Sequence, residues 1–202
     1  MNQQELWNKK FSRDGYLYGT NPNQFIKDAS ANFKKSQTVL CLGEGEGRNA
    51  IFLAKEGFDV EAIDASDIGL NKLFEQSKIE NVEIKTNCLD INDWQASKKY
   101  GVILFSFLHL KIDELKILIK KIESSLEEDG FFVCEVFSKS QIERNSGGPK
   151  DLELLYSIDD FKANIKELEI HKLEEIITHL EEGTGHQGEA SVIRLIAQKA
   201  KI

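Results

Sequence analysis

The stretch that decides the fold is Thr38-Val39-Leu40-Cys41-Leu42-Gly43-Glu44-Gly45-Glu46-Gly47-Arg48-Asn49-Ala50. It opens with an apolar run typical of a buried strand, and helical spacing begins at Arg48 and continues to a stop at Gly57. Glycines stand between the two elements, where they let the backbone turn tightly and approach a ligand without a Cβ in the way. A strand, a glycine loop and a helix in this order predict the first unit of an open α/β sheet, with a ligand site at the carboxyl end of the strand.

The same alternation of short apolar runs and helical periods continues along the chain. Further strands are expected near 58–63, 82–84, 101–105 and 131–137, with helices between them. Two more β-like runs, near 173–180 and 190–198, flank a glycine-rich connection without a helix, which requires them to be antiparallel. The sequence therefore predicts a doubly wound, seven-stranded, mostly parallel α/β sheet of the Rossmann-like kind with an antiparallel C-terminal hairpin.

The N-terminal region is expected to hold a helix from about Pro22 to Phe33, because Asn21 can cap free amides and proline is tolerated at the first helical position. Ahead of it lies an aromatic segment that contains Trp7 and Phe11 and is too rich in glycine to be one long helix. This segment is interpreted either as a lid or as an arm packed on the sheet.

Composition limits the classes of function. The formal net charge of −8 argues against nucleic acid as a partner, because phosphate binding needs clustered Lys and Arg. No apolar stretch is long enough to cross a bilayer, and the first residues lack the pattern of a signal peptide, so a cytoplasmic location is expected. Cys41, Cys88 and Cys134 are widely spaced in or beside apolar runs, which favours buried thiols over disulfides or metal ligands.

Asp64 stands at the end of the second predicted strand. A carboxylate at this place can accept both hydroxyl protons of a ribose, so the loop and Asp64 together predict a cofactor that contains adenosine. The run Gly45 to Ala50 also satisfies the dinucleotide pattern of NAD enzymes. Glu44 and Glu46 oppose a pyrophosphate at the helix N-terminus, whereas they attract the sulfonium and ammonium of S-adenosylmethionine. An alternative in which the glycines form only a turn and Asp64 only caps the next helix is weaker, because both lie in the required order.

These residues resemble the class I methyltransferases, and within them the tellurite-resistance methyltransferase group of small bacterial enzymes. The resemblance covers nearly the whole chain: the arm at 15–23, the glycine loop, and the tail at 185–194. It implies a methyltransferase that transfers the methyl group of S-adenosylmethionine to a small-molecule acceptor, leaving S-adenosylhomocysteine, with a thiol or another soft chalcogen as the suggested nucleophile. The alternatives are an NAD-dependent oxidoreductase and a non-catalytic S-adenosylmethionine-binding regulatory protein.

One position departs from that family. Its members usually place an acid two residues before the first glycine, where it meets the methionine ammonium, and here that position is Cys41. A thiol cannot replace the acid, so Glu44 is expected to supply the negative charge. The resemblance also implies that Leu89 contacts the adenine and that Asp90 accepts from its amine, although Asp90 can equally be a solvated turn acid.

The whole chain, 1–202, is expected to be one domain in three parts. These are an N-terminal arm and helix that cover the cofactor (1–35), a cofactor-binding core (36–138), and an acceptor-side loop, helix and hairpin (139–202). The predicted cofactor-binding residues are Tyr18, Gly43, Glu44, Gly45, Gly47, Arg48, Asn49, Asp64, Ala65, Leu89, Asp90 and Phe105. No metal site is expected.

Methyl transfer is an in-line displacement, so the protein mainly orients the reactants and excludes water. The acceptor is expected past the ends of the fourth and fifth strands, which makes His109 and Glu135 candidates for catalytic residues. His109 is either a general base or a residue that hydrogen-bonds only the loop backbone. His186, in the hairpin connection, either reaches over the site as a third catalytic candidate or belongs only to the hairpin.

Overall fold

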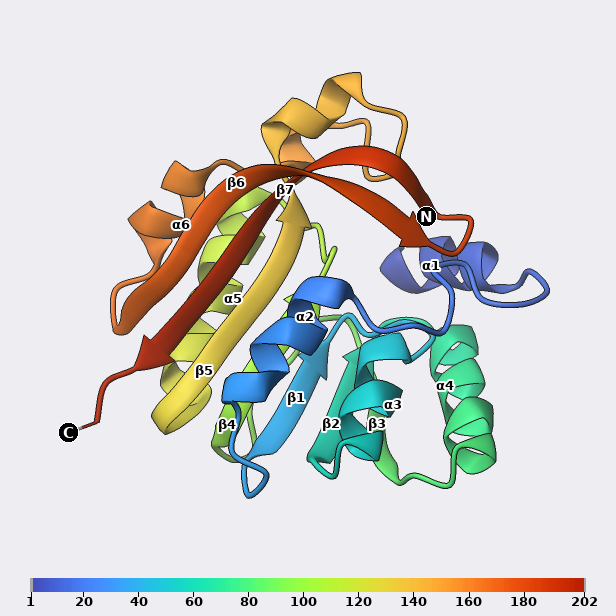
Figure 1. Ribbon diagram of the computed structural model, residues 1–202, viewed down its shortest axis with the longest axis horizontal. Helices are drawn as coiled ribbons and strands as arrows, with labels where there is room; N and C mark the ends of the chain where they lie inside the picture. The colour runs from blue at the N-terminus through green and yellow to red at the C-terminus, as the bar shows by residue number, and fades with distance from the viewer. Residues whose placement is uncertain (1, 202) are drawn as a thin grey trace.

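The computed structural model describes residues 2–201, so the two ends of the predicted domain, residues 1 and 202, lie outside it. Its centre is one seven-stranded sheet with the order β3-β2-β1-β4-β5-β7-β6 (Figure 1). The strands are β1 (Thr38–Leu42), β2 (Asp59–Asp64), β3 (Ile84–Cys88), β4 (Tyr100–Ser106), β5 (Leu126–Phe137), β6 (Leu168–Glu182) and β7 (His186–Lys199). The pairs from β3 across to β5 are parallel, and β7 runs antiparallel to both of its neighbours. The predicted α/β fold with its antiparallel C-terminal hairpin is confirmed.

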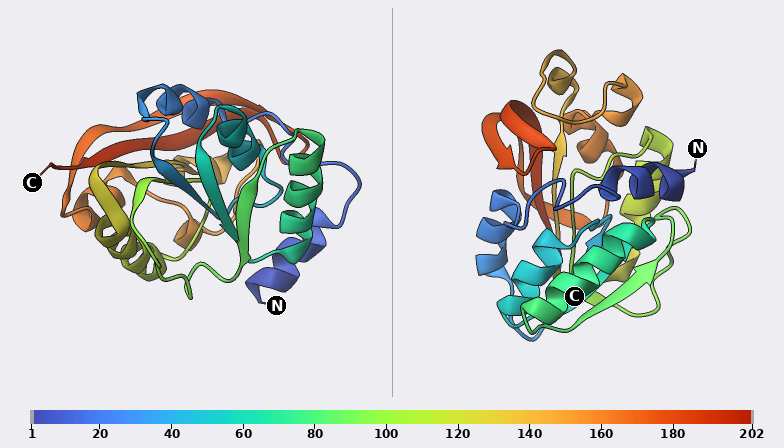
Figure 2. Two further views of the ribbon diagram at one scale, coloured as in Figure 1. Left: turned by 90° about the horizontal axis from the view of Figure 1, so that it is seen from below. Right: turned by 90° about the vertical axis from the view of Figure 1, so that its right-hand side faces the viewer.

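Helices cover both faces of the sheet (Figure 2). They are α1 (Gln3–Phe11), α2 (Gln24–Ala29), α3 (Arg48–Lys55), α4 (Asp67–Ile79), α5 (Ile112–Ser125) and α6 (Ile158–Asn164), with short 3-10 segments at Ser30–Asn32, Lys139–Glu143 and Leu152–Leu154. Helices α2, α3 and α4 share one buried cluster with β1, and α5 and α6 share the other. Parallel strands covered on both faces are apolar at consecutive positions, which is why β1 and β4 show no polar alternation in the sequence.

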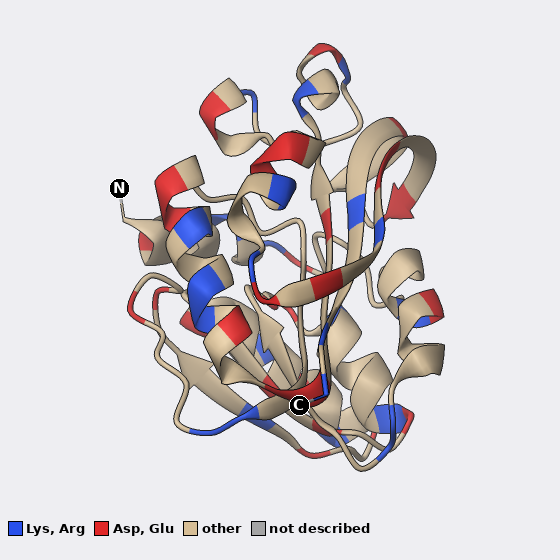
Figure 3. Ribbon diagram, turned by 90° about the vertical axis from the view of Figure 1, so that its left-hand side faces the viewer, with Lys and Arg blue, Asp and Glu red and all other residues tan. Residues whose placement is uncertain are grey.

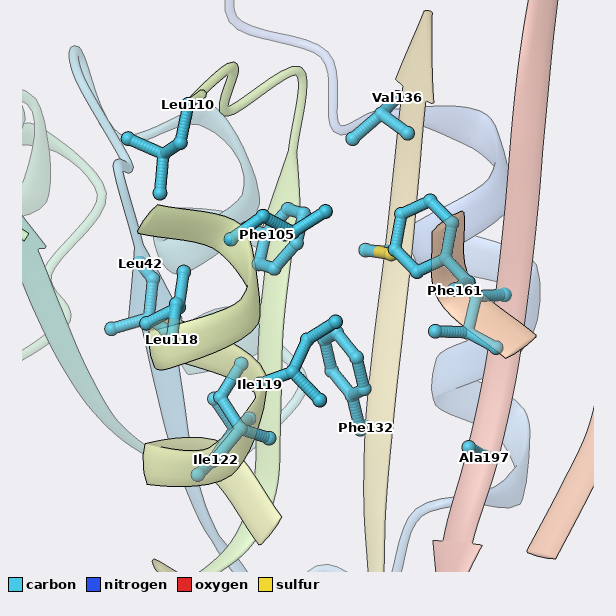
Figure 4. Close-up of a cluster of buried hydrophobic side chains, with 14 of the residues drawn as sticks. Leu42, Phe105, Leu110, Leu118, Ile119, Ile122, Phe132, Val136, Phe161 and Ala197 are labelled. Carbon is cyan, nitrogen blue, oxygen red and sulfur yellow. The ribbon is translucent and has the colours of Figure 1, made fainter. Parts of the chain in front are cut away.

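Successive residues of β1 supply the two cores in turn. Val39 and Cys41 lie in the cluster beneath α2 and α3, whereas Leu40 and Leu42 lie in the cluster beneath α5. Figure 4 shows the second cluster, with Leu42 beside α5. This alternation fixes the sheet between its helices and leaves the carboxyl ends of the strands open at one edge.

The N-terminal region differs from its prediction. The helix expected from Pro22 begins at Gln24, because the side chain of Asn23, rather than Asn21, accepts from the amide of Ile26. A further helix, α1, precedes it and begins with a capping box between Asn2 and Glu5. Cys88 also differs from expectation, since it is exposed on the edge strand β3, while all three thiols are free as predicted.

The hairpin is longer than predicted. Strands β6 and β7 have 15 and 14 residues and are joined by a turn at Gly183-Thr184-Gly185. Lys and Arg are interspersed with Asp and Glu over the face on which β6 forms the sheet edge (Figure 3). Among residues 2–201, none of the helices combines the length and apolarity needed to span a membrane.

Candidate active site

Two adjoining hollows open at the carboxyl ends of the central strands. The first is lined by the ends of β2 and β3, by residues 108–110 and by Gln3 and Trp7 of α1, and its space measures about 440 Å³ with open solvent included. The second lies between the glycine loop, α1, Tyr18 and His186, and its space measures about 500 Å³ with open solvent included. Trp7, Gly43, Asp64 and Leu108 line both hollows. The two therefore form one cleft at the carboxyl ends of the central strands.

Most of the predicted site residues meet in this cleft. The first hollow takes in Gly43, Asp64, Ala65, Leu89, Asp90 and His109. The second takes in Tyr18, Gly43, Glu44, Arg48, Asp64 and His186. Gly45, Gly47, Asn49, Phe105 and Glu135 line neither hollow.

Glu44 lines the second hollow and also caps α3. Its Oε1 accepts from the amides of Asn49 and Ala50 at 2.8 and 2.7 Å, at a helix end whose N-cap residue is glycine and has no side chain to do so. Burial raises the pKa of Glu44 to about 7, although these two amides oppose the rise. Cys41 lies wholly in the core, where burial and the neighbouring Glu44 carboxyl raise the pKa of its thiol. Position 41 therefore does not reach the cleft, and Glu44 does.

Glu46 does not contribute to the cleft, which corrects the argument that two loop acids face the ligand. Its Oε2 accepts from the amide of Leu17 at 2.7 Å, and its Oε1 pairs with Lys72 at 2.8 Å. This carboxylate holds the N-terminal arm against α4.

Asp64 joins the glycine loop to the start of α4. Its Oδ2 accepts from the amide of Gly45 at 2.8 Å and its Oδ1 from the amide of Ser66 at 2.7 Å. Burial raises the pKa of Asp64 to about 6 against the effect of these two bonds. Each carboxylate oxygen keeps a second lone pair on a side chain that lines both hollows.

Gly47 and Asn49 line neither hollow and instead connect the glycine loop to α4, the arm and β4. Gly47 packs against Leu73 of α4. Asn49 bridges the arm and β4, since its Oδ1 accepts from the amide of Asn23 and its Nδ2 donates to the hydroxyl of Ser106, both at 2.9 Å. These two residues shape the cleft without lining it.

Phe105 and Glu135 are the predicted site residues that the structure places furthest from their expected roles. Phe105 points into the core toward α5 and Phe132 (Figure 4), and the next residue along the strand, Ser106, lines the second hollow instead. Glu135 is 1% exposed, and its two oxygens accept from Asn23 Nδ2 at 2.7 Å and from Arg194 Nε at 2.5 Å. Both corrections have one cause: successive strand residues point to opposite faces, so a strand end does not by itself direct a side chain at the ligand.

His109 lies in the cleft and also hydrogen-bonds the backbone of a loop, and whether it acts as a base stays a prediction. It lines the first hollow, and its Nδ1 lies 2.7 Å from the carbonyl oxygen of Leu154. A carbonyl only accepts, so Nδ1 carries the proton and donates it, and Nε2 is left as a buried acceptor with no partner among the described residues. Burial lowers the pKa of His109 to about 4, so the ring is neutral at pH 7.

His186 lies at the start of β7 and lines the second hollow. Its ring centroid is 4.4 Å from those of Tyr18 and Phe107. Tyr18 is itself partly buried in this contact, and burial raises the pKa of its hydroxyl to about 12. The hairpin turn is held on the arm, because the carbonyl oxygen of Leu17 accepts from the amides of Thr184 and Gly185, both at 2.9 Å. Figure 1 shows the turn reaching back to the N-terminal segment.

Helix α1 is the part of the site that the sequence did not predict. Trp7 lines both hollows, and Phe11 lies over Gly45, where a Cβ would meet the ring at 2.9 Å. Asn8 fixes the helix: its Nδ2 donates to Asp67 at 2.8 Å and its Oδ1 accepts from Ser66 at 2.6 Å. The capping box at Asn2 and the four-residue spacing of Trp7 and Phe11 were the signals available for it.

The chain matches a protein-family model and is similar to curated proteins. The family model described as "Tellurite resistance protein TehB" matches residues 7–196. A curated relative from Haemophilus influenzae (strain 10810), named probable S-adenosyl-L-methionine-dependent methyltransferase TehB, is 30% identical over 95 residues, which is 46% of this chain. The matched segment spans 33% of that relative's own length.

Solved structures share the fold. The crystal structure of TehB from Haemophilus influenzae superposes with a TM-score of 0.73 at 21% identity, over 98% of this chain and 67% of that one. A protein solved in work on the conversion of a disulfide bond into a thioacetal group during echinomycin biosynthesis superposes with a TM-score of 0.80 at 13% identity, over 98% of this chain and 92% of that one.

Proposed function

The chain belongs to the tellurite resistance protein TehB family, and from that premise we propose that it is an S-adenosylmethionine-dependent methyltransferase acting on a small-molecule acceptor. The family match confirms the resemblance carried by the arm, loop and tail. The observation that carries the proposal is the single cleft in which Gly43, Asp64 and Asp90, from three strand ends, meet Glu44.

The residues present fit this cofactor better than a dinucleotide. Arg48, the cation that lines the cleft, is already paired with Glu182 at 2.9 Å, and Glu44 adds negative charge beside the loop. A pyrophosphate at this helix N-terminus would face that acid, whereas an ammonium is attracted by it. In our proposal Asp64 accepts from the ribose, Leu89 and Asp90 hold the adenine, and Glu44 faces the methionine ammonium.

The protein's part in the reaction is binding, orientation and exclusion of water. When bound, S-adenosylmethionine supplies an electrophilic methyl group on its sulfonium. Trp7 and Phe11 cover the cleft from α1, and Tyr18 and His186 close the second hollow. Holding two reactants in line within a closed cleft removes most of the entropic barrier to displacement.

For the acceptor we propose a soft nucleophile, a thiol or another chalcogen. The second hollow is lined by aromatic rings, among them Phe11, Tyr18 and Phe107, and its cation Arg48 is neutralised by Glu182. A mostly apolar lining with few fixed charges suits a small sulfur or selenium compound. The TehB description and the sulfur chemistry named for the echinomycin protein support the same class.

Two measurements separate this function from its alternatives. S-adenosylhomocysteine should raise the melting temperature and NADH should not, since only a ligand that binds the native state stabilises it. The opposite result would indicate the oxidoreductase. Methylated product from a panel of small thiols, selenols and amines separates an enzyme from a cofactor-binding regulatory protein, which would give none.

Glu44→Gln should weaken S-adenosylhomocysteine binding by roughly 10- to 100-fold, because a hydrogen bond to a charged partner contributes about 1.5–3 kcal/mol. Burial raises the pKa of Glu44 to about 7, and a bound ammonium favours the ionised form. Wild-type affinity should therefore rise from pH 6 to pH 8, and the variant should lack this rise. Calorimetric titration at three pH values measures both effects.

The matched control for Glu44→Gln is a ligand. 5′-Methylthioadenosine keeps the adenosine and lacks the amino-acid part, so the variant should bind it as the wild type does. An equal loss for both ligands would mean that Glu44 acts only as the cap of α3, through Asn49 and Ala50.

Trp7→Ala should weaken S-adenosylhomocysteine binding by about 30-fold, since the indole lines both hollows and a buried aromatic at a contact centre contributes about 2 kcal/mol. Leu6→Ala is the control on the same helix, because Leu6 is exposed and lines neither hollow. Equal affinities of the Trp7→Ala and Leu6→Ala variants would show that α1 is not part of the binding site.

A further inference from the structure

His186 is held by a carboxylate from the opposite strand of its hairpin. Its Nδ1 lies 2.8 Å from Glu182 Oε2, and the two side chains are only 3% and 11% exposed. An ionised carboxylate only accepts, so Nδ1 carries the proton and Nε2 keeps a free lone pair. Because His186 lines the second hollow, Nε2 is the ring nitrogen left to meet a ligand there.

The charge of Glu182 is maintained by two further side chains. Arg48 Nη1 lies 2.9 Å from Oε1 and Nη2 donates to Oε2 at 3.0 Å, and Asn23 Nδ2 donates to Oε1 at 3.0 Å. Burial raises the pKa of Glu182, but the bonds from His186 and Arg48 outweigh it and bring the pKa to about 2. Burial lowers the pKa of His186. The resting charges are therefore a cationic Arg48, an anionic Glu182 and a neutral His186.

Packing fixes the ring in this position. Its centroid lies 4.4 Å from those of Tyr18 and Phe107 and 5.0 Å from that of Phe137. The adjoining hairpin turn is bonded to Leu17. A ring turned about its bond would break the contact with Glu182 and meet these aromatic neighbours.

His109 lacks these features. Its Nδ1 donates to the neutral carbonyl of Leu154, and no carboxylate lies within ion-pair distance of its ring among the described residues. A proton taken up by His109 would have no counter-charge, whereas one taken up by His186 would form an imidazolium beside Glu182. The two histidines of the cleft are therefore unequal as bases.

Building on the proposed function, we infer that Glu182 is a positioning residue that holds His186 with its proton on Nδ1, so that Nε2 takes the proton of the methyl acceptor. As the acceptor's electron pair bonds the methyl carbon, the carbon–sulfur bond breaks and its electrons remain on the departing thioether sulfur. The acceptor's proton passes to Nε2, and the carboxylate of Glu182 stabilises the imidazolium. Arg48 and Asn23 act one step further out, by keeping Glu182 ionised and in place.

The first test observes the wild-type ring directly. Nitrogen-15 chemical shifts of the folded chain report which ring nitrogen of His186 carries the proton, and His186→Asn serves only to assign the signal. We expect the neutral form protonated on Nδ1 at pH 7.5. A His186 protonated on Nε2 overturns the inference whatever the enzyme methylates.

The second test uses Glu182→Gln. A glutamine oxygen in the place of Oε1 accepts from Asn23 Nδ2 and lies beside Arg48 Nη1, so the NH₂ group takes the place of Oε2, where it faces both Arg48 Nη2 and His186 Nδ1 and moves the ring proton to Nε2. We expect this shift in the spectrum, a fall in kcat for methylation of 2-mercaptoethanol by about 100-fold or more, and S-adenosylhomocysteine affinity within about threefold of wild type. Glu181→Gln is the control, since Glu181 is an exposed neighbour on β6 that lies outside the cleft.

The outcomes separate this inference from the proposed function. If the Glu182→Gln variant methylates the acceptor with the same kcat as the wild type, the role of Glu182 is overturned and the proposed methyltransferase function still stands. Failure of the wild type to bind S-adenosylhomocysteine overturns the methyltransferase, and the ring spectrum still decides the tautomer. If Glu182→Gln does not fold because Arg48 loses its partner, Arg48→Met/Glu182→Gln removes both charges and is measured in its place.

Discussion

Arg194→Met is expected to destabilise the protein by about 3–5 kcal/mol, the cost of leaving a buried charge without its partner. Glu135 is 1% exposed, and Arg194 is the cation bonded to it. Methionine retains an apolar stem beside Phe25, over which the guanidinium lies at 5.2 Å, so the loss is mainly that of the charge. Urea denaturation of the two proteins measures it.

The destabilisation caused by Arg194→Met should increase as the pH rises. Burial raises the pKa of Glu135 in the folded protein, and loss of Arg194 raises it further. An acid whose folded pKa is raised contributes stability at low pH that is lost as the pH rises through that pKa. The deficit of Arg194→Met should therefore be larger at pH 8 than at pH 5.

The double variant Glu135→Gln/Arg194→Met provides the control. With no charge left unpaired, it should recover most of the stability lost by Arg194→Met alone. A single variant within 1 kcal/mol of wild type would show that the pair does not stabilise the fold. Methyltransferase activity retained by Glu135→Gln would exclude the catalytic role first expected of this residue.

Gly47→Ala is expected to destabilise the protein by about 2–5 kcal/mol. Gly47 has φ +95°, a left-handed conformation that costs other residues about 1–2 kcal/mol. An added Cβ would also lie 2.4 Å from Cγ of Leu73, which is fully buried on α4, and overpacking of this kind costs about 1–3 kcal/mol more. The melting temperature and urea midpoint report the sum.

Gly57→Ala separates the two causes. Gly57 has φ +89°, and no atom lies within 4 Å of the added Cβ, so only the backbone term applies. The difference between the two variants is the cost of the contact with Leu73. Equal losses of stability in Gly47→Ala and Gly57→Ala would mean that α4 shifts to accommodate the added Cβ at no cost in free energy.

The central fold could be predicted because its signals are local. Buried parallel strands are apolar at consecutive positions, and the helices between them carry their own period, so β1, β4 and α5 stand out without any knowledge of their partners. The position of the cleft follows from the sheet alone, since ligands bind at the carboxyl ends of parallel strands. Ten of the fifteen predicted site residues line this cleft; eight of them lie at or after the ends of β1 to β4, and Tyr18 and His186 come from the arm and the hairpin.

The remaining features depend on partners far away in the sequence. Glu44 and Glu46 look alike two residues apart, but one caps α3 and the other pairs with Lys72. Asn8 of α1 is fixed by Ser66 and Asp67, about 60 residues later. No local sequence pattern predicts contacts between residues so far apart in the chain. Phe105 is different, because strand alternation could have directed attention to Ser106.

The contact between the N-terminal arm and the hairpin turn has a consequence for how the protein is made. Arg13 donates to Thr184 across 171 residues of sequence, and Leu17 bonds the same turn. At translation rates of about 5–20 residues per second, the arm leaves the ribosome roughly 10–30 s before its partner. During that interval the nascent chain lacks the contact between Tyr18 and His186, and its second hollow closes only after the hairpin turn has left the ribosome.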